Sequence, residues 1–251
     1  KRINPHVPSQ AIEEAIRKIS TVDSGKLESR NEQFHEYLQS GVEVRYFDGT
    51  EDQNDIVYLL DFDNPENNSF HIVNQWTFVE FSEKRPDLLV YVNGIPVVMF
   101  ELKSPSREET DASDAYLQLR NYMKHIPSLF VPNVFCVMSD MSDTRIGTIT
   151  APEDRFVEWK SVDGSYEETQ HATYETLFEG AFPKERLLDI IKNFVCFNDS
   201  NEDVIKILAG YHQYFAVHKA ARRAVEAVEG DGKIGVFWHT QGSGKSLSMV
   251  F

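Results

Sequence analysis

The chain has 251 residues, 41% of them hydrophobic, which suits one large domain or one domain with part of a second. It contains no run of 18 or more apolar residues, so a membrane-spanning helix is excluded. Its formal charge of −15 argues against a protein that binds nucleic acid over its whole surface, because such binding needs clustered lysine and arginine.

The cysteines and the first residues bear on the cellular compartment. Cys136 and Cys196 both lie in apolar stretches, as buried free thiols do in a reducing compartment. The opening KRINPHVPSQ does not resemble a secretory signal. We therefore expect a cytoplasmic protein without disulfides.

The first part of the chain alternates between helix and strand patterns. Apolar residues at helical spacing predict helices over residues 9–20 and 28–39. Runs rich in β-forming residues then predict strands over 42–47, 56–62 and 69–81. The polar cluster DNPENN between the last two is typical of a turn.

Further elements follow a hairpin that is described below. A helix is expected over 111–126, capped by Asp or Ser, and the stretches NVFCVMSD and TRIGTIT are expected strands, followed by a mixed polar region over 151–182. Helical patterns over 184–196 and 201–228 then lead to a short strand over 233–238. We place a domain boundary near residue 183, which divides the chain into 1–182 and 183–251.

The stretch RPDLLVYVNGIPVVMFELKSP contains an Asn-Gly pair between hydrophobic runs, which is a strong signal for a hairpin. Acidic side chains lie near both of its ends. A two-residue loop would pair Val92 with Ile95, and counting outward puts Asp87 and Glu101 on opposite faces. In that register the two carboxylates could not act together.

A three-residue loop, with the glycine in the left-handed conformation, gives the other register. It pairs Tyr91 with Ile95 and Asp87 with Met99. Glu101 then shares a face with Asp87 as a diagonal neighbour, with Cβ atoms about 7 Å apart. We therefore expect a hairpin with this bulged loop.

Two carboxylates at that separation can hold Mg²⁺ between them, at about 2.1 Å per oxygen. Such an ion on Asp87 and Glu101 would polarise a phosphate and activate water. Lys103 lies on the same face and would orient that water, and the carbonyl of Leu102 is a further candidate ligand. The alternative is an ion pair on a solvated face. The nearly continuous apolar strands instead predict a sheet covered on both sides.

These residues resemble a known group of enzymes. Pro86 and Asp87, followed by Glu-Leu-Lys at 101–103, resemble the PD-(D/E)xK nuclease signature, which implies a restriction-endonuclease-like mixed α/β sheet. Gln118 and Tyr122 lie four residues apart on one helical face and resemble the extra motif of the RecB-like branch. In that branch the two residues orient the active site or the DNA. Helix packing by Tyr122 is the alternative.

Three further polar residues are weaker candidates. RecB-like nucleases often use an upstream acid or histidine on the first helix, and Glu32 and His35 occupy such a place here. A solvated helix face is the alternative for both. Asp61 is either a further site residue or the cap of a turn.

The stretch HTQGSGKSLSMVF follows an expected strand and should open a helix, the context of a phosphate-binding loop. The N–H groups of Gly242, Ser243 and Gly244 would surround the phosphates of ATP at a helix N-terminus. Lys245 would reach the β- and γ-phosphates, and the Ser246 hydroxyl would bind Mg²⁺. A fortuitous glycine-rich turn is the alternative.

The loop departs from the strict P-loop pattern, because His239 stands where that pattern has glycine. Superfamily 2 helicases and translocases commonly lack this glycine, so the loop resembles theirs. In that family an upstream glutamine reads the adenine, which implies a role for Gln213; a surface glutamine is the alternative. We expect 183–251 to be the start of a RecA-like motor that does not hydrolyse ATP efficiently without its remaining parts.

A RecB-like nuclease ahead of a superfamily 2 motor resembles the R subunit of type I restriction-modification enzymes. That resemblance implies ATP-driven translocation and Mg²⁺-dependent cleavage of unmodified double-stranded DNA in a prokaryotic cytoplasm. It also implies modification and specificity subunits as partners, which would supply much of the DNA affinity. A catalytically inactive docking module, a repair helicase–nuclease and an ATPase with a structural N-terminal domain stay open as alternatives.

Overall fold

A six-stranded mixed sheet forms the centre of the computed structural model, which describes residues 2–22, 25–103, 112–140, 143–165, 173–200, 203–230, 232–238, 242 and 244–251. The strand order is β10-β9-β8-β7-β6-β3, in which β7 and β8 run parallel and the other neighbours antiparallel. The strands are β3 (Phe70–Asn74), β6 (Leu88–Val92), β7 (Ile95–Leu102), β8 (Phe135–Ser139), β9 (Thr144–Gly147) and β10 (Val157–Glu158).

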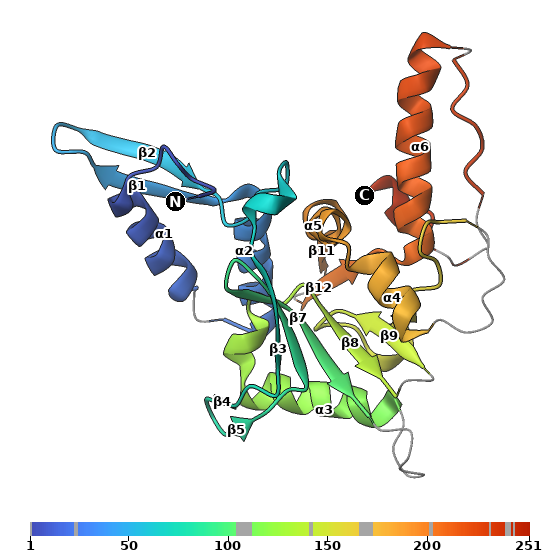
Figure 1. Ribbon diagram of the computed structural model, residues 1–251, viewed down its shortest axis with the longest axis horizontal. Coiled ribbons are helices and arrows are strands. Elements are labelled where there is room, and N and C mark those ends of the chain that lie inside the picture. Colours follow the sequence, from blue (N-terminus) through green and yellow to red (C-terminus); the bar gives the residue numbers. More distant parts are fainter. Residues whose placement is uncertain are drawn as a thin grey trace.

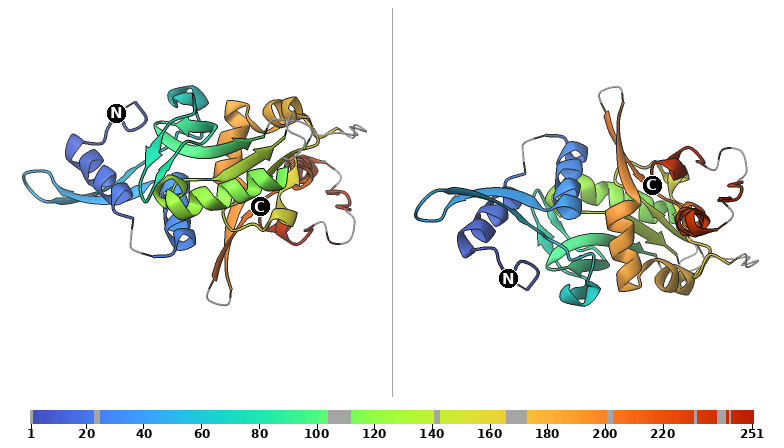
Figure 2. Two further views of the ribbon diagram at one scale, coloured as in Figure 1. Left: turned by 90° about the horizontal axis from the view of Figure 1, so that it is seen from below. Right: turned by 90° about the horizontal axis from the view of Figure 1, so that it is seen from above.

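Helices cover both faces of this sheet (Figures 1 and 2). Leu89 and Met99 pack into a hydrophobic cluster with α3 on one face. Val90 and Phe100 point the other way, into a second cluster with α2, α4 and α5. The expectation of a sheet covered on both sides is therefore confirmed. The helices are α2 (Leu27–Ser40), α3 (Ala112–His125), α4 (Tyr174–Ala181) and α5 (Lys184–Asn193).

The β6–β7 hairpin has a register that differs from the expected one. Val92 pairs with Ile95, so the loop contains two residues, Asn93 and Gly94, with φ values of 53° and 82°. Positive φ at both positions is what a type I′ hairpin turn requires. The prediction of a three-residue loop is therefore wrong, because the asparagine itself adopts the left-handed conformation.

A bulge nevertheless lies inside the hairpin, two residues beyond the turn. Tyr91 pairs with Pro96, but Val90 pairs with Val98, which leaves Val97 without a partner. Proline has no N–H to donate to the ladder, and strand prolines are commonly found at bulges. The bulge moves every later residue of β7 to the other face of the sheet. It therefore places Glu101 on the same face as Asp87, which is the result that the three-residue loop was expected to give.

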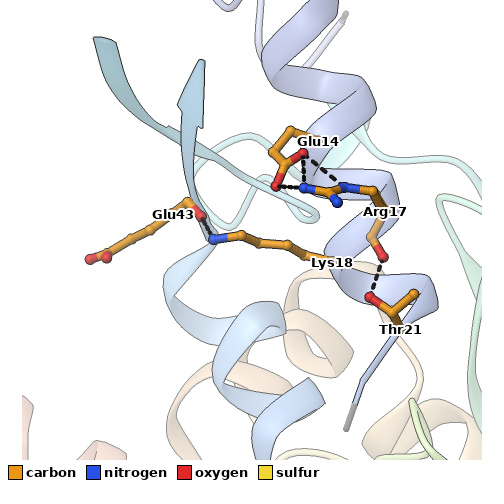
Figure 3. A network of polar contacts seen from close by, with 5 residues as sticks. All are labelled: Glu14, Arg17, Lys18, Thr21 and Glu43. Carbon is orange, nitrogen blue, oxygen red and sulfur yellow. Dashed lines mark hydrogen bonds and ion pairs between the residues drawn. The ribbon is translucent and has the colours of Figure 1, made fainter. Parts of the chain in front are cut away.

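A small layer at the N-terminus packs α1 on a two-stranded hairpin. Figure 3 shows the polar side of this contact, where the Lys18 ammonium donates to the carbonyl oxygen of Glu43 at 2.7 Å. The strand predicted over 56–62 extends no further than Val57. The elements are α1 (Ser9–Ser20), β1 (Val42–Phe47) and β2 (Asp52–Val57).

The strand predicted over 69–81 is interrupted at Gln75, which has a φ of 49°. The chain leaves the sheet there and forms a small separate hairpin before it returns as β6. Its strands are β4 (Phe78–Val79) and β5 (Glu83–Lys84). Elsewhere in the described residues, 3₁₀ turns lie at Pro65–Asn67, Pro127–Phe130, Glu153–Arg155 and Leu247–Met249.

The region after the sheet differs most from expectation. The helix predicted over 201–228 is wrong in its first part, because residues 203–208 form a strand. Val204, Ile205 and Ile207 are β-branched, and pairing with the preceding strand satisfies their backbone groups. The elements are β11 (Val195–Ser200), β12 (Asp203–Leu208) and α6 (Tyr211–Glu229). Among the described helices, none is long and apolar enough to cross a membrane.

The described residues between 232 and 251 do not form the expected strand and helix. No strand lies over 233–238, and Val236 and Trp238 are 92% and 78% exposed. The described residues after Gly244 form only a short 3₁₀ turn. A central parallel strand needs neighbours on both edges, and no described strand lies beside this segment.

The hydrophobic core continues across the proposed domain boundary. Leu177 lies before residue 183, and Leu187, Ile191 and Tyr214 lie after it, yet all belong to the same buried cluster. The boundary near residue 183 stays a prediction.

Lys206 on β12 is buried in the core and holds the β11–β12 hairpin against the sheet. Its ammonium donates to Asn31 Oδ1 at 2.9 Å and to the Asn133 carbonyl oxygen at 2.6 Å. Its backbone carbonyl accepts from the Thr148 hydroxyl, and its N–H donates to the Thr150 hydroxyl oxygen. One residue therefore joins β12 to α2 and to the segments flanking β8 and β9.

Burial lowers the pKa of Lys206 to about 7, since an ammonium loses its hydration there. The unfolded chain keeps this proton up to about pH 10.4, so unfolding takes up a proton between the two values. We expect the free energy of unfolding to rise from pH 7 to pH 9 by up to about 1.4 kcal/mol per pH unit. In Lys206→Met, the free energy of unfolding measured by urea denaturation should rise less steeply with pH than in the wild type. Lys192→Met, at an exposed lysine, serves as the control and should keep the wild-type slope of unfolding free energy against pH. Equal slopes in the wild type and both variants would contradict the lowered pKa of Lys206.

Candidate active site

Asp87 and Glu101 lie on the sheet face that α3 covers. Asp87 precedes Leu89 by two residues and Glu101 follows Met99 by two, and both of these apolar side chains pack against α3. The last pair of the ladder is Leu88 with Phe100, so the same register places Asp87 opposite Glu101. The shared face that the sequence predicts is therefore present, although the bulge at Val97 produces it.

The carboxylate of Asp87 is held against the end of β7. Its Oδ2 atom accepts the backbone N–H of Leu102 at 2.8 Å. Its backbone carbonyl accepts the N–H of Gln75 at 2.9 Å, at the point where the chain turns out of β3. Asp87 is thus fixed beside Glu101 from both neighbouring strands.

Glu101 is the most buried acid of the site. It is 4% exposed, and its Oε1 atom pairs with the Lys103 ammonium at 2.7 Å. Its Oε2 atom is buried and has no hydrogen-bond partner among the described residues. Burial raises the pKa of Glu101, the Lys103 contact lowers it, the nearby charge of Asp87 raises it, and a hydrogen bond with Tyr122 lowers it. A buried carboxylate oxygen without a partner is unusual and suggests a missing ligand.

Gln118 and Tyr122 on α3 complete the cluster. Burial, opposed by a hydrogen bond from Gln118, raises the pKa of the Tyr122 phenol to about 12, and the charges of Glu101 and Asp87 add to the rise. The Tyr122 hydroxyl also lies 3.4 Å from the Arg85 carbonyl oxygen, a long hydrogen bond. The helix face that the sequence singled out therefore does meet the carboxylates.

Tyr174, at the start of α4, is a neighbour that the sequence did not indicate. Burial raises the pKa of its phenol, and the charge of Asp87 raises it further. Its ring also packs edge-on against Phe100. Tyr174 stands in a mixed polar stretch without a motif, so only the folded chain brings it to Asp87.

The donor set of this cluster fits a hard divalent cation. Among the described residues no group of three or more His, Cys, Asp or Glu side chains could hold a metal. Mg²⁺ needs no such group, because it commonly binds through one or two carboxylates and keeps several waters. Asp87 and Glu101 would supply these two carboxylates, and the Leu102 carbonyl stays a candidate.

Two of the weaker candidates have other surroundings. His35 is 2% exposed and lies against the Phe197 ring near Lys206, where burial lowers its pKa well below the usual value. Asp61 caps a turn, since its Oδ1 atom accepts the N–H groups of Asp63 and Asn64. Glu32 is half-buried on α2, and its role stays a prediction.

The glycine-loop candidates lie only partly within the described residues. His239 and Ser243 fall outside them. Gly242 and Gly244 have φ values of 83° and 76°, which glycine adopts readily. The structure also brings Gln213 into contact with this loop.

Gln213 uses both ends of its side-chain amide. Oε1 accepts the N–H of Gly210 and so caps α6, while Nε2 donates to the Gly244 carbonyl oxygen at 3.0 Å. Two candidates that are 31 residues apart in the chain are therefore in contact. Lys245 and Ser246 follow this contact directly, and the nucleotide roles of all these residues stay predictions.

Two family models match parts of the chain. The model of the family described as "Type I restriction enzyme R protein N terminus" matches residues 1–155, which include all of β6, β7 and α3. A second family model, described as SWI2/SNF2 ATPase, matches residues 212–251.

Three relatives carry related names. The type I restriction enzyme HindI endonuclease subunit of Haemophilus influenzae is 38% identical over the whole chain, which covers 24% of that protein. A protein of Methanocaldococcus jannaschii, named as a candidate type I restriction enzyme MjaIXP endonuclease subunit, is 31% identical over the whole chain and 26% of its own length. The SauMSSORF170P endonuclease subunit of Staphylococcus aureus is 26% identical over 76% of the chain and 20% of its own length.

The chain thus spans about a quarter of the length of the first two of these relatives. The family match covers more than half of the chain, and the highest of these identities extends over all of it. The chain therefore belongs to the family of type I restriction enzyme R proteins and corresponds to the N-terminal part of such a protein.

Proposed function

We propose that Asp87, Glu101 and Lys103 form a Mg²⁺-dependent active site that hydrolyses phosphodiester bonds of unmodified double-stranded DNA. One observation carries the proposal: the buried Oε2 atom of Glu101 has no described partner and lies in a cluster with a second carboxylate and an ammonium. The relatives' names, which call them endonuclease subunits of type I restriction enzymes, support the assignment.

Each side chain has a distinct task in this proposal. Asp87 and Glu101 hold the cation, which when bound polarises a phosphate oxygen and makes a nearby water more acidic. Lys103 keeps its contact with Glu101 Oε1, orients the attacking water and stabilises negative charge on the phosphate in the transition state. The leaving oxygen takes a proton from solvent.

The role of Gln118 and Tyr122 is to position the carboxylates. Tyr122 is 4% exposed and its phenol stays protonated at neutral pH, since its pKa is about 12. It can therefore donate a hydrogen bond but cannot serve as a base under those conditions. Gln118 acts through Tyr122, with which it shares a hydrogen bond.

We further propose that residues 242–246 bind the phosphates of ATP in the full-length protein, with Lys245 on the β- and γ-phosphates and Gln213 near the adenine. The SWI2/SNF2 match over 212–251 and the contact between Gln213 and Gly244 support this. ATP-driven translocation, modification and specificity subunits as partners and a prokaryotic cytoplasm complete the proposal. Copurification of a specificity subunit would favour it over a repair helicase–nuclease.

Removal of the charged groups should abolish cleavage. We expect Asp87→Ala and Lys103→Ala in the full-length protein each to reduce Mg²⁺-dependent nicking of a DNA duplex about 100-fold or more, the size expected for a group that stabilises transition-state charge. Asp63→Ala, at an exposed acid outside the site, should cleave normally. Equal activity in all of these proteins would favour the alternative of an inactive docking module.

The ionised Glu101 side chain should reduce the stability of the folded protein. Its raised pKa means that the folded chain disfavours the ionised form, so its contribution to stability falls as the pH rises through that pKa. Glu101→Gln should therefore raise the unfolding midpoint at pH 7 to 8, by an amount that shrinks toward acid pH, while abolishing cleavage.

Thermal unfolding with a matched control tests this expectation. Glu66 also pairs with a lysine, Lys184, but its side chain is 79% exposed. Glu66→Gln should change the midpoint little, because exposed ion pairs contribute about 1 kcal/mol or less. A Glu101→Gln protein that is less stable than wild type at neutral pH would contradict the assigned cause of the pKa shift.

The nucleotide site has its own test. Lys245→Ala in the full-length protein should reduce ATP hydrolysis about 100-fold, because a phosphate clamp would be lost. Lys192→Ala, an exposed lysine on α5, serves as the control and should hydrolyse ATP at the wild-type rate. Normal hydrolysis by the Lys245 variant would remove this loop from the nucleotide site.

A further inference from the structure

The β4–β5 hairpin, residues 75–86, is fastened directly to the candidate active site. At its entry the N–H of Gln75 donates to the Asp87 carbonyl oxygen, and at its exit the Arg85 carbonyl lies within reach of the Tyr122 hydroxyl. Gln75 adopts a φ of 49°, a conformation that non-glycine residues rarely take and that is often found at functional sites. The base of the hairpin is thus built into the carboxylate cluster.

The far end of the hairpin is anchored as well. The N–H of Phe81 donates to the His125 carbonyl oxygen at the end of α3. The Glu80 carboxylate accepts the N–H and hydroxyl of Ser128 at 3.1 and 2.8 Å. Figure 1 shows the hairpin at the lower edge of the sheet, beside one end of α3. The hairpin therefore has a defined position relative to the site.

Large apolar side chains remain exposed on this anchored hairpin. Trp76, Val79 and Phe81 are 57%, 68% and 75% exposed, while Phe78 alone packs against the core. Grouped exposed apolar side chains on a soluble protein commonly mark an interaction surface. The base of the same hairpin is joined to Asp87 and Tyr122, so this group lies on an element of the candidate site.

Positive charges accompany the aromatic side chains. Lys84 is the last residue of β5 and Arg85 follows it, while Lys124 lies on α3 next to His125, whose carbonyl binds Phe81. None of the three forms an ion pair with another described residue. The hairpin also carries Glu80, which Ser128 holds, and Glu83. Free cations interleaved with exposed aromatic rings are typical of surfaces that bind a nucleic-acid strand.

We propose that the β4–β5 hairpin is a contact surface for the DNA beside the scissile phosphate. Trp76 and Phe81 lie against bases or sugars, while Lys84 and Arg85 contact backbone phosphates. The proposal rests on the proposed function, since it names the element that guides DNA to Asp87 and Glu101. It also places two cations, Lys84 and Arg85, beside the site in a chain whose overall charge is −15.

Binding of a short fluorescein-labelled DNA duplex to the full-length protein in Ca²⁺ tests the proposal by anisotropy. We expect Trp76→Ala to bind about tenfold more weakly, which corresponds to about 1.4 kcal/mol for the lost aromatic contact. Phe47→Ala is the matched control, because Phe47 is 56% exposed on the β1–β2 hairpin, and it should bind normally. Arg85→Gln should reduce the slope of log K against log salt by about 1, whereas Lys18→Gln should not.

Photo-crosslinking records the contact itself, because other parts of the full-length protein also contribute to DNA affinity. Benzoylphenylalanine in place of Trp76 should crosslink to the DNA, and in place of Phe47 it should not. Unchanged affinity and salt slope in the hairpin variants, or a crosslink from position 76 to another protein subunit in place of DNA, would overturn the proposal. DNA crosslinking by a protein that shows no Asp87-dependent cleavage would instead overturn the proposed function and leave this surface in place.

Discussion

The backbone ladder between β6 and β7 contains one unpaired residue, Val97, and the placement of the candidate site depends on it. Side chains alternate between the faces of a strand, so one extra residue moves all later side chains to the opposite face. Without the bulge, Asp87 would lie opposite Phe100, whose ring packs in the cluster with α4 and α5. With it, Asp87 lies opposite Glu101 beneath α3. The unpaired residue Val97 therefore decides whether Asp87 and Glu101 lie together on one face or apart on opposite faces.

The apolar cover on both faces of the sheet sets the electrostatics of this arrangement. Glu101 is held where water is largely excluded, which raises its pKa and strengthens its interactions with Lys103 and with any bound cation. The same burial keeps Tyr122 protonated. The chain therefore places a poorly solvated carboxylate in its core, an arrangement that lowers stability and is expected at sites where function requires it.

The candidate nucleotide loop contacts α6, which packs in the hydrophobic cluster on the sheet face opposite the carboxylates. The β11–β12 hairpin is hydrogen-bonded to the sheet region through Lys206, and α6 follows it directly. Tyr214 on α6 packs into the same cluster as Phe100, while Gln213 next to it contacts Gly244.

Local patterns in the sequence determined those elements whose hydrogen bonds or burial are themselves local. Helix 9–20, strand 42–47 and the presence of a hairpin around Asn93 and Gly94 could all be predicted, because each depends on spacing within a short window. The same spacing named Asp87, Glu101 and Lys103 as site candidates. The same windows misassigned 203–208 as helix and 233–238 as strand, since strand formation depends on partners that lie elsewhere in the chain.

Only the tertiary structure decided the position of the bulge, the approach of Tyr174 to Asp87 and the burial of His35 away from the carboxylates. The sequence determined which chemical groups the site contains, because residue type and spacing are written in it directly. Their register and surroundings depend on contacts between residues far apart in the chain, which no local pattern records.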